Sequence, residues 1–331
     1  MRAGPAKLAV SLFILVMAAA AVLTVGPVDI PAREVLQIFW ESIAGDPANR
    51  AVPLEHAQIV LHIRWPRIAL AMLTGAALSL TGACYQGLFR NPLADPYLLG
   101  VSSGAALGAV LAIASHKTAY LGLYAFGGGI AAMAAVAMLG TRPGGQPSSS
   151  LLLAGVAVSA LGNALISYIL AVNIQEAGIA FFWLMGSLAN PPERLGMIAL
   201  LAAAAGAAVM SHARELDILA LGEENAQSLG VDVARTKAVL FASTALLVGL
   251  VVAASGCIGF VGLVVPHIAR RLFGPAHGIL LPGSAIWGAV FLLAADGVTR
   301  SVAILATMPV GIVTALFGSP LFIYILYRTS R

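Results

Sequence analysis

Nine long stretches of this chain contain no charged residue, with histidine counted as neutral, and all of them reach the length of a membrane crossing. A helix needs about 18–20 apolar residues to cross ~30 Å of hydrocarbon. The uncharged stretches are Leu8–Val28, Ile68–Phe89, Pro96–His116, Thr118–Thr141, Pro143–Gln175, Leu195–Ala213, Ala238–Ala269, Leu272–Ala295 and Ser301–Tyr327. The strands of a membrane barrel are only about ten residues long. The pattern therefore predicts an all-α, polytopic membrane protein.

Two of these stretches are longer than one crossing. Pro143–Gln175 opens with GGQPSSS, so its helix is expected to begin near Ser150. Ala238–Ala269 is interrupted at Ser255–Gly259, which predicts one full helix followed by a shorter one that ends near Leu272. This division gives about ten crossings and places both termini on the same side. Only 10% of the residues are charged, against about 25% in soluble domains, as expected for a surface that faces lipid.

Lysine and arginine indicate the orientation, because cytoplasmic loops carry an excess of them. With the N-terminus inside, the inner segments hold 11 of the 18 basic residues and the outer segments hold 7. We therefore expect an inner-membrane protein with both termini in the cytoplasm. The turn Asn91–Gly100 (NPLADPYLLG) then lies at the cytoplasmic face, where Asn91 and Asp95 can close it. The net charge of +4 follows from this topology, and no nucleic-acid partner is expected.

Two polar segments interrupt an otherwise apolar chain. Residues 29–63 are amphipathic and are expected to lie on the outer face. Residues 213–237 are expected to form a cytoplasmic segment. Since neither is large enough to be a domain, residues 1–331 are predicted to form a single transmembrane domain.

The predicted crossings hold few groups that could do chemistry. Ion-coupled transporters usually carry ionisable residues at mid-membrane, and here the exceptions are Asp296 and Arg300, which at i,i+4 spacing can pair with each other. An intramembrane enzyme is equally poorly supported. Cys84 and Cys257 sit alone in apolar stretches, where they are expected to act as small hydrophobic residues, and no metal site or bound cofactor is expected.

The chain also lacks a phosphate-binding loop, since none of its three lysines follows the glycine that such a loop requires. If the protein moves a solute against a gradient with ATP, the ATP would therefore be hydrolysed by another subunit. An ion-coupled secondary transporter or a channel, neither of which needs an ATPase subunit, stays as the alternative to an ATP-driven transporter.

The cytoplasmic segment contains a candidate docking element at Leu221–Val233 (LGEENAQSLGVDV). Gly222 and Gly230 can each end a helical turn, and Glu223 and Glu224 suit a helix N-terminus. The spacing predicts two short helices joined by glycine, although a solvated loop would also fit the pattern.

Several specific motifs resemble one family over the chain's whole length. They are RWPR (64–67), TGAALSLTGACYQGLFRNPLADPYLLGVSSGAALG (74–108), LLLAGVAVSAL (151–161), WLMGSL (183–188), LGEENAQSLGV (221–231), GFVGLVVPHIARRLFG (259–274), and ADGVTR with PVGIVTALFGSPLF near the end. With this set, the chain is similar to the FecCD-type permeases of type II ABC importers, which take up iron–siderophores, haem or vitamin B12.

The resemblance implies a role for three outer arginines. In this family such arginines bind acidic residues of the substrate-binding protein, and the matching positions are Arg64 and Arg67, at the expected start of the second helix, and Arg300. Arginine suits this task because its guanidinium forms bidentate pairs with carboxylates. From the residues alone, Arg64 and Arg67 could instead be interfacial arginines that reach toward water.

Further roles follow from the same resemblance. It assigns coupling to the ATPase to Leu221, Gly222, Glu223, Glu224, Ala226, Leu229 and Gly230, the cytoplasmic gate to Ser148 and Ser149, and a polar pathway lining on the fifth helix to Asn163, Ser167 and Tyr168. It implies alternating access by two permease protomers, identical or paralogous, whose fifth and tenth helices line the central path. The other partners are two ATP-binding subunits, which use ATP and magnesium, and a periplasmic or lipid-anchored binding protein. Iron–siderophore is the expected substrate, with haem or cobalamin as alternatives.

Overall fold

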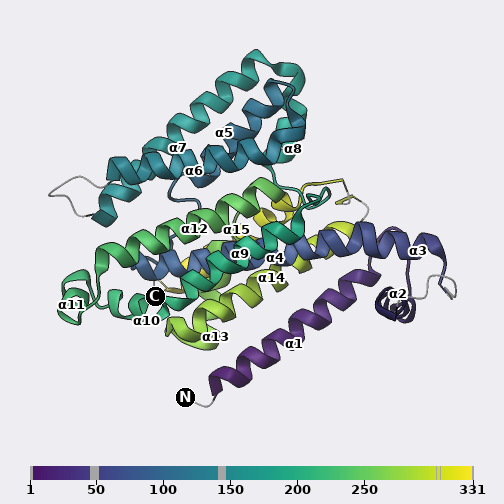
Figure 1. Cartoon of the computed structure of the whole chain (residues 1–331), viewed down its shortest axis with the longest axis horizontal. Helices are drawn as coiled ribbons and strands as arrows, with labels where there is room; N and C mark the ends of the chain where they lie inside the picture. The colour runs from purple at the N-terminus through teal and green to yellow at the C-terminus, as the bar shows by residue number, and fades with distance from the viewer. Residues whose placement is uncertain (1–2, 45–51, 141–146, 303, 306, 330–331) are drawn as a thin grey trace.

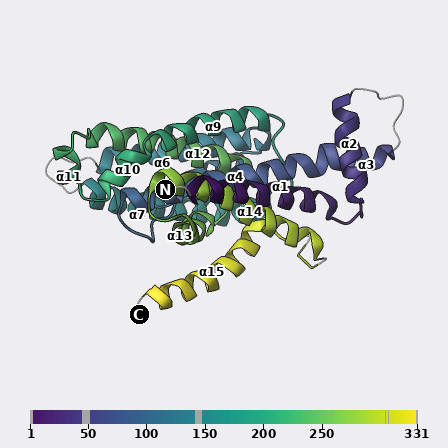
Figure 2. The same ribbon diagram turned by 90° about the horizontal axis from the view of Figure 1, so that it is seen from below.

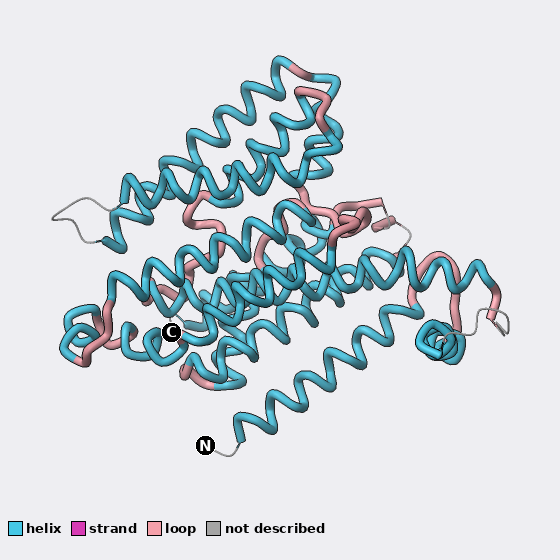
Figure 3. Tube along the Cα trace, in the orientation of Figure 1, coloured by secondary structure: helices cyan, strands magenta, loops and turns pink. Residues whose placement is uncertain are grey.

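The computed structural model describes residues 3–44, 52–140, 147–302, 304–305 and 307–329, and the regular elements within these ranges are all helices (Figures 1 and 3). The α-helices are α1 (Ala3–Thr24), α2 (Ala32–Ala44), α3 (Leu54–Gln58), α4 (Trp65–Leu88), α5 (Val101–Ala114), α6 (Leu121–Gly140), α7 (Pro147–Val172), α8 (Ala177–Leu184), α9 (Leu195–Ser211), α10 (Ala213–Leu219), α11 (Glu223–Ser228), α12 (Val233–Ser255), α13 (Val261–Phe273), α14 (His277–Ser301) and α15 (Val310–Thr329). A π-helical turn, η2 (Ile59–Arg64), joins α3 to α4, and the 3-10 turns η3 (Thr118–Tyr120) and η4 (Ile174–Glu176) precede α6 and α8. The predicted all-α fold is confirmed.

The predicted crossings coincide with α1, α4, α5, α6, α7, α9, α12, α13, α14 and α15. Within the described residues, 6 helices are long and apolar enough to cross a membrane alone, and α9 with α10, bent by 47°, can form a seventh. The apolar helices at the remaining predicted crossings, in α5, α13 and α15, are shorter than this length within the described residues. The interruption predicted at Ser255–Gly259 separates α12 from α13.

Helix α4 forms the centre of the bundle, where it packs against α14, α13 and α12 (Figure 1). Helix α12 also contacts α6, which with α5 and α7 forms a second group of helices. Helix α1 lies at the opposite edge against α14. Helix α15 extends away from the bundle (Figure 2), with only limited contact to α13 and α14.

Glycine permits the closest contacts between these helices. Gly75 of α4 and Gly288 of α14 face each other so closely that a methyl group on either would collide with the other's backbone. The small-residue pattern at Gly104 and Gly108 gives α5 the same close approach to α6. Close backbone contact of this kind is how membrane helices associate when the surrounding lipid is as apolar as the side chains.

The turn after α4 has the predicted bounds, Asn91–Gly100, because α5 begins at Val101. The helix within the uncharged stretch Pro96–His116 is therefore shorter than the full crossing predicted there. Asn91 and Asp95 accept hydrogen bonds from the backbone N–H groups of Leu93 (2.9 Å) and Tyr97 (2.8 Å), and so close the turn as expected. Burial raises the pKa of Asp95 to about 6, against the opposing effect of the Tyr97 N–H.

Tyr97 connects the turn to a second irregular segment. Its hydroxyl donates to the carbonyl of Ile258 and accepts from the N–H of the same residue, both at 3.0 Å. These bonds join the turn to the break between α12 and α13. Because an unpaired backbone group inside a membrane is costly, this contact stabilises two irregular segments at once.

Candidate functional site

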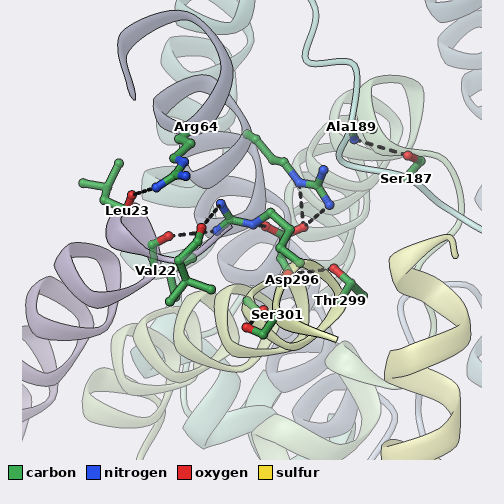
Figure 4. A network of polar contacts seen from close by, with 12 residues as sticks. Val22, Leu23, Arg64, Ser187, Ala189, Asp296, Thr299 and Ser301 are labelled. Carbon is green, nitrogen blue, oxygen red and sulfur yellow. Dashed lines mark hydrogen bonds and ion pairs between the residues drawn. The ribbon is translucent and has the colours of Figure 1, made fainter. Parts of the chain in front are cut away.

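Three arginines and one aspartate gather at the end of the bundle that carries α2 and α3 (Figure 4). Arg64 ends the π-helical turn, Arg67 follows in α4, and Asp296 and Arg300 lie one turn apart in α14. The resemblance placed Arg64 and Arg67 at the start of a helix. Helix α4 does begin there, at Trp65, and α3 and η2 extend it on the N-terminal side so that Leu54–Leu88 form one continuous helix.

Two of the arginines bind the end of α1. Arg64 donates to the carbonyl oxygens of Leu23 (2.6 Å) and Val28, and Arg300 donates to those of Val22 and Val25, each at 3.1 Å. The last carbonyls of a helix have no intrahelical partner and carry partial negative charge. The two guanidinium groups therefore cap α1 and hold its end against α4 and α14.

Asp296 links the other contacts of the cluster. Its Oδ1 lies 2.8 Å from both Nε and Nη2 of Arg67, and its Oδ2 lies 3.1 Å from Nε of Arg300. The predicted pairing of Asp296 with Arg300 is confirmed, while the pairing with Arg67 was not predicted. The Asp296 side chain is 0% exposed, and those of Arg67 and Arg300 are 20% and 9% exposed.

The cluster borders a cavity of about 330 Å³, lined by Gly26, Pro27, Val28, Ile59, Ile63, Arg64, Arg67 and Arg300. The cluster itself, three guanidinium groups and one carboxylate, has a formal charge of +2 (three minus one), and Asp29 acts on Arg64 from outside the cluster. Such a site attracts anions, because buried charges are weakly screened. Among the described residues, no group of three or more His, Cys, Asp or Glu side chains could hold a metal ion.

At the other end of the bundle lie the short helices α10 and α11 (Figure 1). Of the two short helices predicted for Leu221–Val233, the structure has one in that segment, α11, while α10 precedes it. Gly222 joins them at φ 114°, and Gly230 follows α11 at φ 81°, conformations that glycine adopts without strain. Ala226 is buried, whereas Leu221 and Leu229 are 64% and 63% exposed. The pair therefore presents an apolar surface away from the bundle.

One hydrogen-bonded pair and one ion pair attach these helices to the membrane part. Asp217 of α10 lies 2.6 Å from Nδ1 of His277 in α14 and also accepts that residue's backbone N–H at 2.9 Å. Glu223, at the start of α11, lies 2.6 Å from Nζ of Lys237 in α12. Movement of α10 and α11 would thus act directly on α12 and α14. No local pattern in the chain predicts either pairing, because the partners are brought together by the fold.

The predicted pathway residues lie on an exposed face of α7. Asn163, Ser167 and Tyr168 are all exposed, and the Ser167 hydroxyl donates to the carbonyl of Asn163 at 2.9 Å. The backbone of Ser148 and Ser149 forms the first turn of α7. Their side chains lie outside the described residues, so the gate assignment stays a prediction.

Comparison with known proteins covers almost the whole chain. The model of the FecCD transport family matches residues 12–328.

The chain belongs to the FecCD transport family.

Three curated relatives are permease proteins named for different substrates. The cobalamin import permease BtuC of Halobacterium salinarum is 45% identical over 85% of this chain and 76% of its own length. The hemin transport permease HmuU of Yersinia pestis is 42% identical over 82% and 83%. The Fe(3+) dicitrate permease FecD of Escherichia coli is 39% identical over 97% and 99%.

A solved structure gives the same result for the fold. A transporter described as of the metal-chelate ABC type, in an inward-facing conformation, matches with a TM-score of 0.84 and 33% identity, over 98% of this chain and 99% of its own. This FecCD chain is therefore a multi-pass membrane permease of the ABC transporter class, and the resemblance seen in its motifs is confirmed.

Proposed function

We propose that this chain is the permease subunit of an ATP-driven importer that moves a metal chelate across the cytoplasmic membrane by alternating access, with both termini in the cytoplasm. The observation that carries the proposal is the FecCD match over residues 12–328. An iron–siderophore is the proposed substrate, with haem or cobalamin as the other candidates. The relatives named for hemin, cobalamin and Fe(3+) dicitrate support this class of cargo.

ATP hydrolysis would occur in two separate subunits that dock on α10 and α11. The exposed Leu221 and Leu229 offer an apolar contact. The Asp217–His277 hydrogen bond and the Glu223–Lys237 ion pair would transmit force to α14 and α12. The coupling role extends to Gly222, Glu224, Ala226 and Gly230, which shape this element. This chain would bind no cofactor itself.

The arginine cavity would receive acidic side chains of a periplasmic or lipid-anchored binding protein. Arg67 is the most exposed of the three, so an incoming carboxylate would meet it first. Arg64 and Arg300 already bind the end of α1, and they would contribute mainly through their charge. In this state Asp296 occupies the site that the partner's carboxylate would compete for.

A second permease protomer would cover α7 and α15. Both helices expose apolar side chains, among them Leu153 and Val156 on α7 and Phe317 and Ile323 on α15. A central path between two such faces would carry Asn163, Ser167 and Tyr168, with Ser148 and Ser149 at its cytoplasmic end. Affinity for the chelate would then reside in the binding protein, because these groups are few and weakly polar.

Uptake of a radiolabelled ferric siderophore into proteoliposomes tests this function. With the permease, the ATPase subunit and the binding protein present, uptake should require ATP and should stop when the ATPase subunit is inactivated. Uptake driven by a pH gradient alone, without ATP, would refute the proposal and favour an ion-coupled secondary transporter.

A further inference from the structure

A groove of about 600 Å³ lies between the N-terminal half of α1, the end of α13 and α14. It is lined by Ala6, Lys7, Val10, Ser11, Ile14, Arg271, Leu272, Phe273 and Trp287. It lies at the same end of the bundle as α10 and α11, and α1 is at the edge of the molecule, away from α5–α8 and α15 (Figures 1 and 2). The groove is therefore separate from both the arginine cavity and the proposed transport path.

Hydrogen bonds fix the walls of the groove. Lys7 donates from Nζ to the carbonyl of Leu272 at 2.7 Å, and Trp287 donates from Nε1 to the Ser11 hydroxyl at 3.1 Å. That hydroxyl in turn donates to the carbonyl of Lys7 at 2.8 Å. These hydrogen bonds hold α1 against α13 and α14, so the groove is formed without a ligand.

The groove carries positive charge at one end and is apolar along the rest. Lys7 uses one of its three ammonium donors on Leu272. Arg271 is exposed and makes no ion pair within the described part of the chain. No carboxylate is among the described lining residues. Below the two cations, Val10 and Ile14 expose their side chains along α1.

This combination matches one molecule of the surrounding membrane. We propose that the groove binds an anionic glycerophospholipid, with its phosphate between Lys7 and Arg271 and an acyl chain along Val10, Ile14 and Leu272. Basic pockets between membrane helices recognise acidic headgroups in this way. A zwitterionic lipid fits less well, because the positively charged group of its headgroup would lie close to the charges of Lys7 and Arg271.

Native mass spectrometry after extraction from nanodiscs of mixed phosphatidylglycerol and phosphatidylcholine tests the site. The wild-type chain should retain phosphatidylglycerol preferentially. In the double variant Lys7→Gln/Arg271→Gln, the affinity should fall about 30-fold, since each basic group contributes about 1 kcal/mol and 1.4 kcal/mol is tenfold. The matched control Lys117→Gln/Arg194→Gln removes one exposed lysine and one exposed arginine elsewhere and should retain the lipid like the wild type.

Two further measurements separate the lipid from a free anion. Val10→Trp fills the groove without changing its charge and should also reduce retention of phosphatidylglycerol. Dioctanoyl phosphatidylglycerol should displace the retained lipid at concentrations at which glycerol phosphate has no effect. Equal retention of both lipids by the wild type, unchanged retention in the double variant, or equal competition by glycerol phosphate would each overturn the proposal.

Discussion

Replacement of Asp296 by asparagine should destabilise the protein by about 3 kcal/mol. Breaking a buried ion pair by removing one partner costs about 3–5 kcal/mol, because the other charge is left uncompensated. The lower end applies here for two reasons. Arg300 keeps its bonds to Val22 and Val25, and the amide oxygen can still accept from Arg67.

Thermal unfolding of the purified protein measures this effect. A loss of 1 kcal/mol lowers Tm by about 2–4 °C in domains of 150–250 residues, and the lower value suits this larger chain. We therefore expect Tm to fall by about 6 °C in Asp296→Asn. The control Glu193→Gln neutralises an exposed carboxylate and should leave Tm within about 1 °C.

A double-mutant cycle isolates the pair itself. If Arg67 and Asp296 interact as the 2.8 Å contacts indicate, Arg67→Gln combined with Asp296→Asn should cost less than the sum of the single changes, by about 0.5–3 kcal/mol.

Asp296→Asn also tests docking of the binding protein, for which we expect a gain in affinity although the permease loses stability. The neutral amide in Asp296→Asn raises the formal charge of the cluster from +2 to +3, the charge of the three arginines alone. The binding protein should therefore associate more tightly. An unchanged Tm together with additive single changes would refute the assigned role of Asp296. Unchanged association would count against competition between Asp296 and the partner's carboxylate.

Two other predictions concern the cytoplasmic end and the turn. Leu221→Ala/Leu229→Ala should weaken ATPase-subunit binding by about 3 kcal/mol in a pull-down titration, since burial of each of the two leucines is worth about 1.5–3 kcal/mol. Leu200→Ala, on the exposed face of α9, should not weaken it, and equal effects would refute the docking assignment. The raised pKa of Asp95 means that folding favours its protonated form, so its contribution to stability is present below about pH 4 and is lost as the pH rises to about 6. The Tm of Asp95→Asn relative to wild type should therefore rise from pH 4.5 to pH 7, and a constant difference would contradict the effect of burial.

Local features of the sequence predicted much of the architecture. Apolar length located the helices, the SGCIG interruption separated α12 from α13, and glycine spacing predicted the short helix α11. Each of these depends on the backbone preferences or hydrophobicity of neighbouring residues. The family assignment also came from the sequence, because the motifs run through the whole chain.

The contacts that the sequence did not predict share one physical cause, since each joins residues that are far apart in the chain. Tyr97 bonds to Ile258, 161 residues away, and this contact joins the turn to the break between α12 and α13. Arg67 meets Asp296 across 229 residues, so no local spacing could reveal that pair.

The sequence by itself determined that the chain is an α-helical membrane protein, because a bilayer accepts only backbones whose hydrogen bonds are satisfied locally or by closure. Its motifs identified the permease family. Which charged groups meet was decided by the tertiary structure alone. The end of α1, the helix Leu54–Leu88 and α14 must first pack together. Only then do their unpaired carbonyls and charged side chains, which cannot stay unsatisfied away from water, find one another in the arginine cluster.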